Sequence, residues 1–140
     1  MIELFLALAI RLGEFEITPP PPDVVVASED YIKEQCGIDY RGTLWGCFTP
    51  VQPTRVFVNE SATGVLGVSY VLHEIVHYVQ YHNGRMANGA QGLYGCKRWL
   101  VNELQAFEVQ EAWLQKQYVV MPFGEQIKAR YKAACKEIET

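Results

Sequence analysis

The chain has 140 residues, of which 49% are hydrophobic and 20% are charged, and its formal net charge at pH 7 is −4. This length and composition predict one globular domain over residues 1–140, with enough apolar side chains for one core but not for two. The acidic balance offers no basic stripe to neutralise phosphates, so we expect no nucleic-acid partner. The sequence has no stretch of 18 apolar residues, so we expect no membrane span.

Hydrophobic spacing and prolines define the N-terminal elements. Apolar side chains at helical spacing predict an amphipathic helix over residues 1–13, which lacks the positive n-region and the cleavage site of a signal peptide. Four prolines at residues 19–22 predict a stiff, extended connector. Residues 24–27 are mostly valine and predict a strand, after which Ser28 is suited to cap a short helix that runs towards Gly37.

The rest of the chain contains two further strands and three further helices. Residues 43–48 and 55–59 predict strands that form an antiparallel pair through a proline-containing turn. Helices follow over about residues 69–81, 99–114 and 125–138, with a long glycine-containing loop between the first two. This order predicts an α+β fold in which a small antiparallel sheet packs on the first of these helices and on the helix that follows it.

Two histidines one helical turn apart are the strongest functional signal in the chain. His73, Glu74 and His77 form the pattern H-E-x-x-H within the helix predicted over residues 69–81. Positions i and i+4 share a helix face, so His73 and His77 can bind one zinc ion, while Glu74 lies near enough to take a proton from zinc-bound water. The flanking residues are nearly all apolar or aromatic, which is typical of a buried helix. The competing interpretation is a hydrogen-bonded His/Glu pair in the core, with no metal.

A third protein ligand has to come from outside this motif. The metzincin pattern H-E-x-x-H-x-x-G-x-x-H would need glycine and histidine at the positions where this chain has Gln80 and Asn83. His82 is one residue out of register, which favours a surface or supporting role over a ligand role for this side chain.

A glutamate from the next helix is the other source of a ligand, and the helical neighbours of each candidate distinguish them. Glu103 shares its helix face with apolar and aromatic residues, whereas Glu108 lies among polar ones. Glu103 is therefore the better ligand, and the small residue Ala106 would let the two helices approach closely. A solvated helix carboxylate is the alternative interpretation of Glu103.

The combination of these motifs resembles a known group of enzymes. H-E-x-x-H at residues 73–77, followed on a second helix by Asn-Glu-x-x-Ala at 102–106, resembles the gluzincin group of zinc metallopeptidases, and in particular its small single-domain members, the minigluzincins. The turn at 94–96 and the helix after it also resemble small secreted bacterial proteins of unknown function that carry this motif. The likeness covers roughly residues 54–114.

This resemblance implies a zincin-like fold and a zinc peptidase activity. His73, His77 and Glu103 would be the zinc ligands, and Glu74 would be the general base. The remaining coordination position would be left to a water, whose pKa zinc lowers towards ~7 and whose proton Glu74 would accept and later pass to the leaving amine.

Transition-state stabilisation and substrate binding need further groups. The sequence leaves five candidate donors for the oxyanion open: Tyr78, Tyr81, His82, Tyr94 and Arg98. The strand over residues 55–59 is expected to offer a sheet edge to which an extended peptide could add by backbone hydrogen bonds. We therefore expect a peptide or protein substrate.

The four cysteines, Cys36, Cys47, Cys96 and Cys135, have no C-x-x-C spacing and are even in number, which favours two disulfides. We expect Cys36–Cys47, which would close a glycine-rich segment, and Cys96–Cys135, which would attach the last helix to the loop before Glu103. Each would stabilise the fold by roughly 2 to 4 kcal/mol. Such bridges indicate an oxidising compartment, so the protein is expected to be secreted or periplasmic; four free thiols would indicate the cytoplasm.

Two other classes of function fit the same residues. One is a non-catalytic zinc module whose site is closed by a fourth protein ligand, for which Cys96 or His82 is available. The other is a zinc amidase that acts on a non-peptide amide, such as one in a cell wall. Metal content measured together with hydrolytic activity separates these classes.

Overall fold

The computed structural model describes the backbone of residues 1–37, 42–86 and 92–139, and within these ranges all side chains except those of 92–95, 131, 132, 134 and 136–139. Across these ranges the fold is α+β, with five helices and one three-stranded sheet. The elements in chain order are α1 (Ile2–Gly13), β1 (Asp23–Ala27), α2 (Glu29–Cys36), β2 (Gly46–Cys47), β3 (Arg55–Asn59), α3 (Gly64–His82), α4 (Gly92–Lys116) and α5 (Phe123–Glu139).

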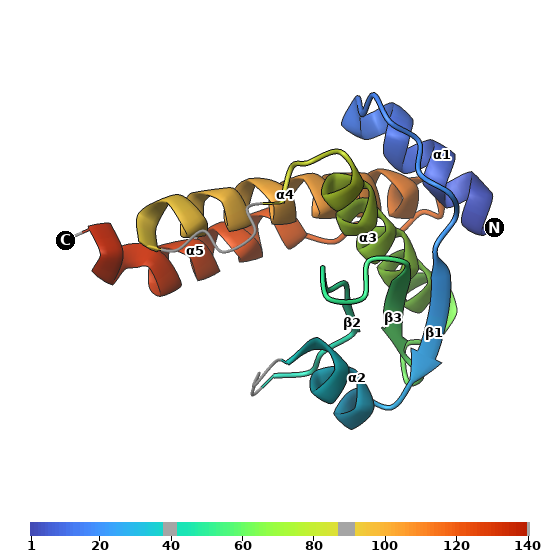
Figure 1. The fold of residues 1–140 in the computed structure, drawn as a ribbon, viewed down its shortest axis with the longest axis horizontal. Helices are drawn as coiled ribbons and strands as arrows, with labels where there is room; N and C mark the ends of the chain where they lie inside the picture. The colour runs from blue at the N-terminus through green and yellow to red at the C-terminus, as the bar shows by residue number, and fades with distance from the viewer. Residues whose placement is uncertain (38–41, 87–91, 140) are drawn as a thin grey trace.

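Helix α3 is the central element of the molecule (Figure 1). It packs against α1, α4 and the sheet, while α4 and α5 form a long pair that extends away from the sheet. The chain termini lie at opposite ends of this arrangement. Since α3 carries the H-E-x-x-H motif, the motif lies where the helical pair and the sheet meet.

The sheet is mixed, with strand order β1-β3-β2. The predicted antiparallel pairing of the second and third strands is confirmed, because Cys47 in β2 faces Phe57 in β3. The prediction of an antiparallel sheet is wrong for β1, which pairs with β3 in parallel. The prediction that residues 55–59 form a sheet edge is also wrong, since β3 is bonded on both sides and its Val56, Phe57 and Val58 are buried.

The two faces of β3 pack against different helices. Successive strand residues point to opposite faces, and accordingly Val56 joins the core cluster of α1, α3 and α4, while Phe57 joins Ile32 of α2. Ser28 caps helix α2, as predicted, because its hydroxyl accepts from the backbone N–H of Tyr31. The sheet is thus held between α2 and α3.

Two helices begin earlier than the hydrophobic pattern predicts. Helix α3 begins at Gly64 and not near residue 69, and α4 begins at Gly92 and not near residue 99. Both first turns contain glycines, which in a sequence predict a loop and not a helix. At Gly67 a Cβ would lie 2.4 Å from the carbonyl oxygen of Ala62, so only glycine lets the chain before α3 fold back onto it.

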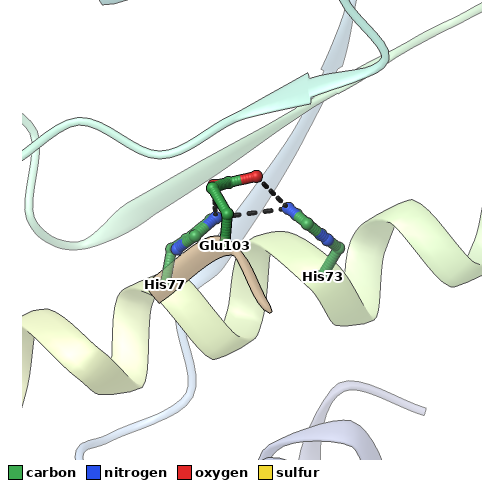
Figure 2. Close-up of side chains that lie close together, drawn as sticks. All are labelled: His73, His77 and Glu103. Carbon is green, nitrogen blue, oxygen red and sulfur yellow. Dashed lines mark hydrogen bonds and ion pairs between the residues drawn. The ribbon is translucent and has the colours of Figure 1, made fainter. Parts of the chain in front are cut away.

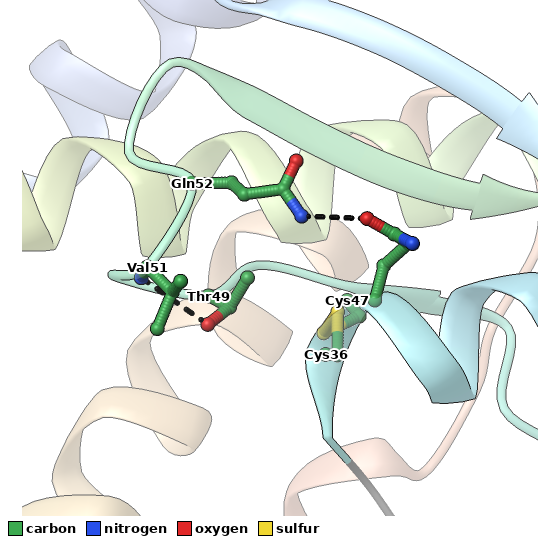
Figure 3. Close-up of a disulfide and its surroundings, with 6 residues drawn as sticks. Cys36, Cys47, Thr49, Val51 and Gln52 are labelled. Carbon is green, nitrogen blue, oxygen red and sulfur yellow. Dashed lines mark hydrogen bonds between the residues drawn. A yellow bond between two sulfur atoms is a disulfide. The ribbon is translucent and has the colours of Figure 1, made fainter.

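Both predicted disulfides are present. Cys36 at the end of α2 bonds to Cys47 in β2, and Cys96 in α4 bonds to Cys135 in α5, with Cα atoms 6.7 and 6.0 Å apart. Figure 3 shows the first bridge beside a hydrogen bond of 2.9 Å from Gln52 to the side chain that precedes Cys36. Disulfides of this kind are typical of oxidising compartments. None of the helices, as far as their residues are described, is long and apolar enough to cross a membrane.

Candidate metal centre

His73, His77 and Glu103 converge in the structure, and we call them the ligand cluster (Figure 2). The histidines lie one turn apart on α3, and Glu103 reaches them from α4. Nε2 of His77 lies 2.5 Å from Glu103 Oε1 and 3.2 Å from Nε2 of His73, and Nε2 of His73 lies 3.5 Å from Glu103 Oε2. One donor atom from each residue lies within 4.8 Å of the other two, so the group could hold a metal ion.

The packing of α4 on α3 explains why Glu103 and not Glu108 joins the histidines. Ala106 is fully buried between the helices, as expected for a residue that permits close approach. Glu103 lies one turn before it, on the same helix face. Glu108 is exposed. The ring of Phe107 lies 4.3 Å from the ring of His73 and covers one side of the cluster.

The charges of the cluster are strongly coupled. Burial lowers the pKa of His77, but the charge of Glu103 and the hydrogen bond to it outweigh burial and raise that pKa to about 9. Burial opposes ionisation of Glu103, yet the adjacent imidazoles of His77 and His73 hold its pKa well below the ordinary value. In the metal-free protein a proton on His77 therefore supplies the positive charge that Glu103 faces.

A buried glutamine fixes the ring of His73. Its Nδ1 lies 3.0 Å from Gln110 Oε1, and Gln110 Nε2 donates to Ser69 Oγ at 2.8 Å. The hydroxyl of Ser69 donates to the carbonyl of Leu66, so Ser69 is the acceptor towards Gln110. The amide oxygen of Gln110 must then face His73, whose Nδ1 carries the hydrogen.

His77 has an equivalent partner from its own helix. Its Nδ1 lies 2.8 Å from Gln80 Oε1, while Gln80 Nε2 donates to the backbone carbonyl of Asn102 and to Gln105 Oε1, both at 2.9 Å. A carbonyl can only accept, so the amide of Gln80 is oriented without ambiguity. His77 therefore also carries a hydrogen on Nδ1.

These networks decide what the Nε2 atoms can do. With Nδ1 of both rings donating to glutamine, the two Nε2 atoms and the partly buried Glu103 carboxylate face one another, and in the metal-free protein the second proton of His77 lies on Nε2 towards Glu103. When that proton leaves, three acceptors remain at these distances, and they repel one another unless a cation lies between them. The donor set thus fits a divalent metal ion, and two nitrogens with one carboxylate form a set that zinc binds in proteins.

Glu74 is buried beside the cluster and incompletely bonded. Its Oε2 is a buried side-chain atom without a hydrogen-bond partner, the only one of its kind among the side chains described. Burial raises the pKa of Glu74, although the imidazoles of His73 and His77 oppose this effect. Its Cγ packs on the backbone of Gly46 in β2, where a Cβ would lie only 2.8 Å away. An orphaned carboxylate oxygen of this kind fits a group that accepts a proton.

A cleft of about 610 Å³ opens above the cluster, and His73, Glu74, His77 and Glu103 line its base. One wall is the segment 43–48, which includes β2, and the other walls come from α3, α4 and α5. Six of the described aromatic side chains line the walls: Trp45, Phe48, Tyr70, Trp99, Phe107 and Phe123. Trp45 and Trp99 remain 36% and 40% exposed, so the cleft is open to solvent and apolar in lining.

The structure brings none of the predicted oxyanion donors with a described side chain to the cleft. The hydroxyl of Tyr78 donates to the carbonyl of Pro20, and Nε2 of His82 bonds to the carbonyl of Pro53. Tyr81 packs against His82, and Arg98 does not line the cleft. Tyr94 lies outside the residues whose side chains the structure describes.

Two polar residues that the sequence did not single out line the cleft instead. Tyr70 lies one turn before Glu74 on the same face of α3, and a count of four back from Glu74 could have found it. Burial raises the pKa of Tyr70, and Arg130 of α5 is close enough to oppose that shift. Arg130 could not have been found, because α5 has no sequence link to the motif.

The structure also removes the two predicted fourth ligands. The sulfur of Cys96 is bonded to Cys135, so it is not available as a thiolate. His82 points to Pro53 and does not belong to the cluster. The interpretation of a zinc site closed by Cys96 or His82 as a fourth ligand is therefore wrong.

No family model, no curated protein and no solved structure matches this chain. The resemblance to gluzincins consequently rests on the motif residues, and the function has to be argued from the site.

Proposed function

We propose that the protein is a zinc-dependent hydrolase of the gluzincin type, with a zincin-like domain, that cleaves peptide bonds. The observation that carries the proposal is the unpartnered Oε2 of Glu74, buried next to three metal donors at the base of an open cleft. A structural metal site does not need a further carboxylate with a free oxygen. A general base needs that free oxygen in order to accept a proton.

Zinc is the ion that the donor set favours. Two imidazoles and one carboxylate are the ligands of open, catalytic zinc sites, whereas calcium and magnesium prefer oxygen donors throughout. Bound zinc would supply Lewis acidity towards a water molecule and an amide carbonyl. His73, His77 and Glu103 would hold it.

The residues around the cluster supply the proton transfers. Glu74 accepts the proton of the attacking water through Oε2 and returns it to the leaving amine, and burial, which raises the pKa of Glu74, makes it a stronger base. Tyr70 donates a hydrogen bond to the oxyanion, because its phenol lines the cleft and its raised pKa keeps the O–H protonated.

The cleft fits an extended peptide. Strand β2 is an edge strand and lines the cleft, so its backbone, and not that of residues 55–59, can pair with substrate. The aromatic walls favour apolar side chains beside the scissile bond. A non-peptide amide with an apolar substituent is the second candidate, supported by the same lining.

The two disulfides support a proposal about location. Both bridges would be lost in a reducing compartment, so we propose that the protein acts outside the cytoplasm, secreted or in a periplasm.

Two isosteric substitutions test the proposal. Glu74→Gln should keep about one zinc per chain but lower peptide cleavage by roughly 10²-fold or more, since general-base catalysis contributes that much. Glu103→Gln replaces a charged ligand by a weak neutral one, so zinc should be lost first and cleavage with it. Zinc is measured by elemental analysis, and cleavage by mass spectrometry on synthetic peptides with aromatic and aliphatic residues.

The matched control is Glu108→Gln, which changes an exposed carboxylate on the same helix and should alter neither quantity. If Glu74→Gln lost zinc as readily as Glu103→Gln, Glu74 would be a ligand. If Glu74→Gln cleaved peptides as fast as the parent, the assignment of Glu74 as general base would be wrong, and a parent that binds zinc but cleaves no amide would be a structural zinc module.

A further inference from the structure

Both histidines of the ligand cluster bond through Nδ1 to a glutamine, and not to a carboxylate or a backbone carbonyl. Gln110 comes from α4 and Gln80 from α3, and each is completely buried. Glutamines from two different helices therefore make the same contact, with Nδ1 of a histidine. Glutamine has both a donor and an acceptor, so it can bond to an imidazole N–H and be anchored by a carbonyl or hydroxyl at once.

We propose that Gln80 and Gln110 are positioning residues that keep a hydrogen on Nδ1 of His77 and His73, so that Nε2 of each ring faces the metal position before any ion arrives and is the atom that binds it, on His77 after loss of the proton shared with Glu103. The inference rests on the proposed metal site but not on hydrolysis. Partners of this kind orient a metal-binding histidine and typically change metal affinity 10- to 100-fold when removed.

The two glutamines differ in what anchors their amide nitrogen, and this difference makes the proposal testable. Gln110 donates to the hydroxyl of Ser69, which can rotate and donate back to an oxygen. Gln80 donates to the backbone carbonyl of Asn102 and to Gln105 Oε1. Gln105 is itself oriented, because its own amide nitrogen donates to the carbonyl of Gly13. A glutamate can thus be accommodated at position 110 but faces two acceptors at position 80.

Four variants separate a positioning role from a packing role. Gln110→Met keeps the length of the side chain but removes the acceptor, so Zn²⁺ affinity should fall 10- to 100-fold. Gln110→Glu restores the acceptor and should return the affinity to within about threefold of the parent or above it. Gln80→Glu should weaken binding at least about tenfold, since its carboxylate meets two oxygens. Ser69→Ala leaves both glutamines in place but frees the amide of Gln110 to turn, and should produce a smaller loss.

Two readouts are independent of catalysis. Zn²⁺ affinity is measured by competition with a chromophoric chelator, and the ring tautomer by long-range ¹⁵N–¹H spectra of the histidines in the metal-free protein. The parent should show His73 with hydrogen on Nδ1 only, and Gln110→Met should show a mixture of both tautomers. Ser69→Ala should shift the same signals if Gln110→Met does not fold.

Three results would overturn the proposal. The first is an unchanged Zn²⁺ affinity in Gln110→Met, and the second is an Nε2–H tautomer of His73 in the parent. The third is equal behaviour of the glutamate variants at positions 80 and 110. A parent that binds zinc with the expected tautomers but cleaves no peptide would leave this inference standing and remove only the proposed peptidase activity.

Discussion

In the ligand cluster, every nitrogen of His73 and His77 has a partner, whereas in the cleft directly above it one oxygen of Glu74 has none among the described residues. The two regions share helix α3 and lie within one turn of each other. The difference separates two tasks. A metal-binding group gains from bonds that fix it in advance, while a proton acceptor needs a free lone pair where the substrate will be.

The surroundings follow the same division. The cluster is held by helix–helix packing between α3 and α4, with both orienting glutamines buried. The cleft is bounded by the short strand β2 and by α5, and each of these is attached to the rest of the fold by a disulfide. Changes in the cluster should therefore affect metal binding, and changes in the cleft walls should affect turnover.

The largest effect should come from removing a ligand. His77→Ala takes one of three donors away and leaves Gln80 without the imidazole that it accepts from. We expect zinc content to fall from about one per chain to none, by elemental analysis of protein that has not met chelator. His82→Ala is the matched control, since His82 contacts Pro53 outside the cluster, and it should keep its zinc.

The sequence predicted the cluster better than the cleft, for a physical reason. His73, Glu74 and His77 are placed by a single helix, and the apolar face around Glu103 marks how α4 must pack on α3, so local periodicity is sufficient. The cleft depends on contacts between distant elements. Arg130 reaches it only because α5 lies back along α4, and no local pattern encodes that.

The same limit explains the errors in the sheet. The pairing of β2 with β3 is a local hairpin and was predicted, but the parallel pairing of β1 with β3 crosses α2 and leaves no local signal. Because β1 pairs with β3, β3 is the central strand of the sheet and not the expected edge. The edge available to a substrate is consequently β2.

Removing each disulfide should affect the two cleft walls, β2 and α5, differently. The loops closed span 11 and 39 residues, so chain entropy predicts losses in unfolding free energy of about 3 kcal/mol for Cys36→Ala/Cys47→Ala and about 4 kcal/mol for Cys96→Ala/Cys135→Ala. Activity should show the reverse order, because Cys47 belongs to the strand that packs on Glu74. Urea denaturation and peptide cleavage at a temperature where both variants remain folded provide the measurements.

A thiol titration of the denatured, unreduced parent is the control for this experiment and should find no free thiol. Four free thiols would contradict the disulfides and the proposed location. If the two double variants lost activity in proportion to their stability, β2 would have no special relation to Glu74.

A smaller change at the cleft wall is Gly46→Ala. The added Cβ would lie 2.8 Å from Glu74 Cγ and 3.1 Å from the carbonyl oxygen of Phe57, so the carboxylate has to move. We expect a loss of about tenfold in kcat/KM, since displacing a catalytic group by even about 1 Å is costly, with zinc content unchanged. Gly124→Ala, where a Cβ would meet nothing within 4 Å, should leave both unchanged. Loss of zinc in Gly46→Ala would show that the wall and the cluster are not separable.

The last expected effect, on stability and not on turnover, is the pH dependence of the metal-free protein. The pKa of His77 is raised from 6.5 to about 9 in the folded protein, so the folded state binds the proton more tightly than the unfolded chain. This stabilisation is fully present below pH 6.5 and is lost as the pH rises towards 9. Urea midpoints measured with a chelator present should therefore fall across this interval. With zinc bound the ion takes the place of the proton, and the decrease should shrink or reverse, since metal binding strengthens as protons leave. A metal-free protein whose stability is flat or rises between pH 6.5 and 9 would mean that His77 is not paired with Glu103. The ligand cluster would then not be assembled before the ion binds.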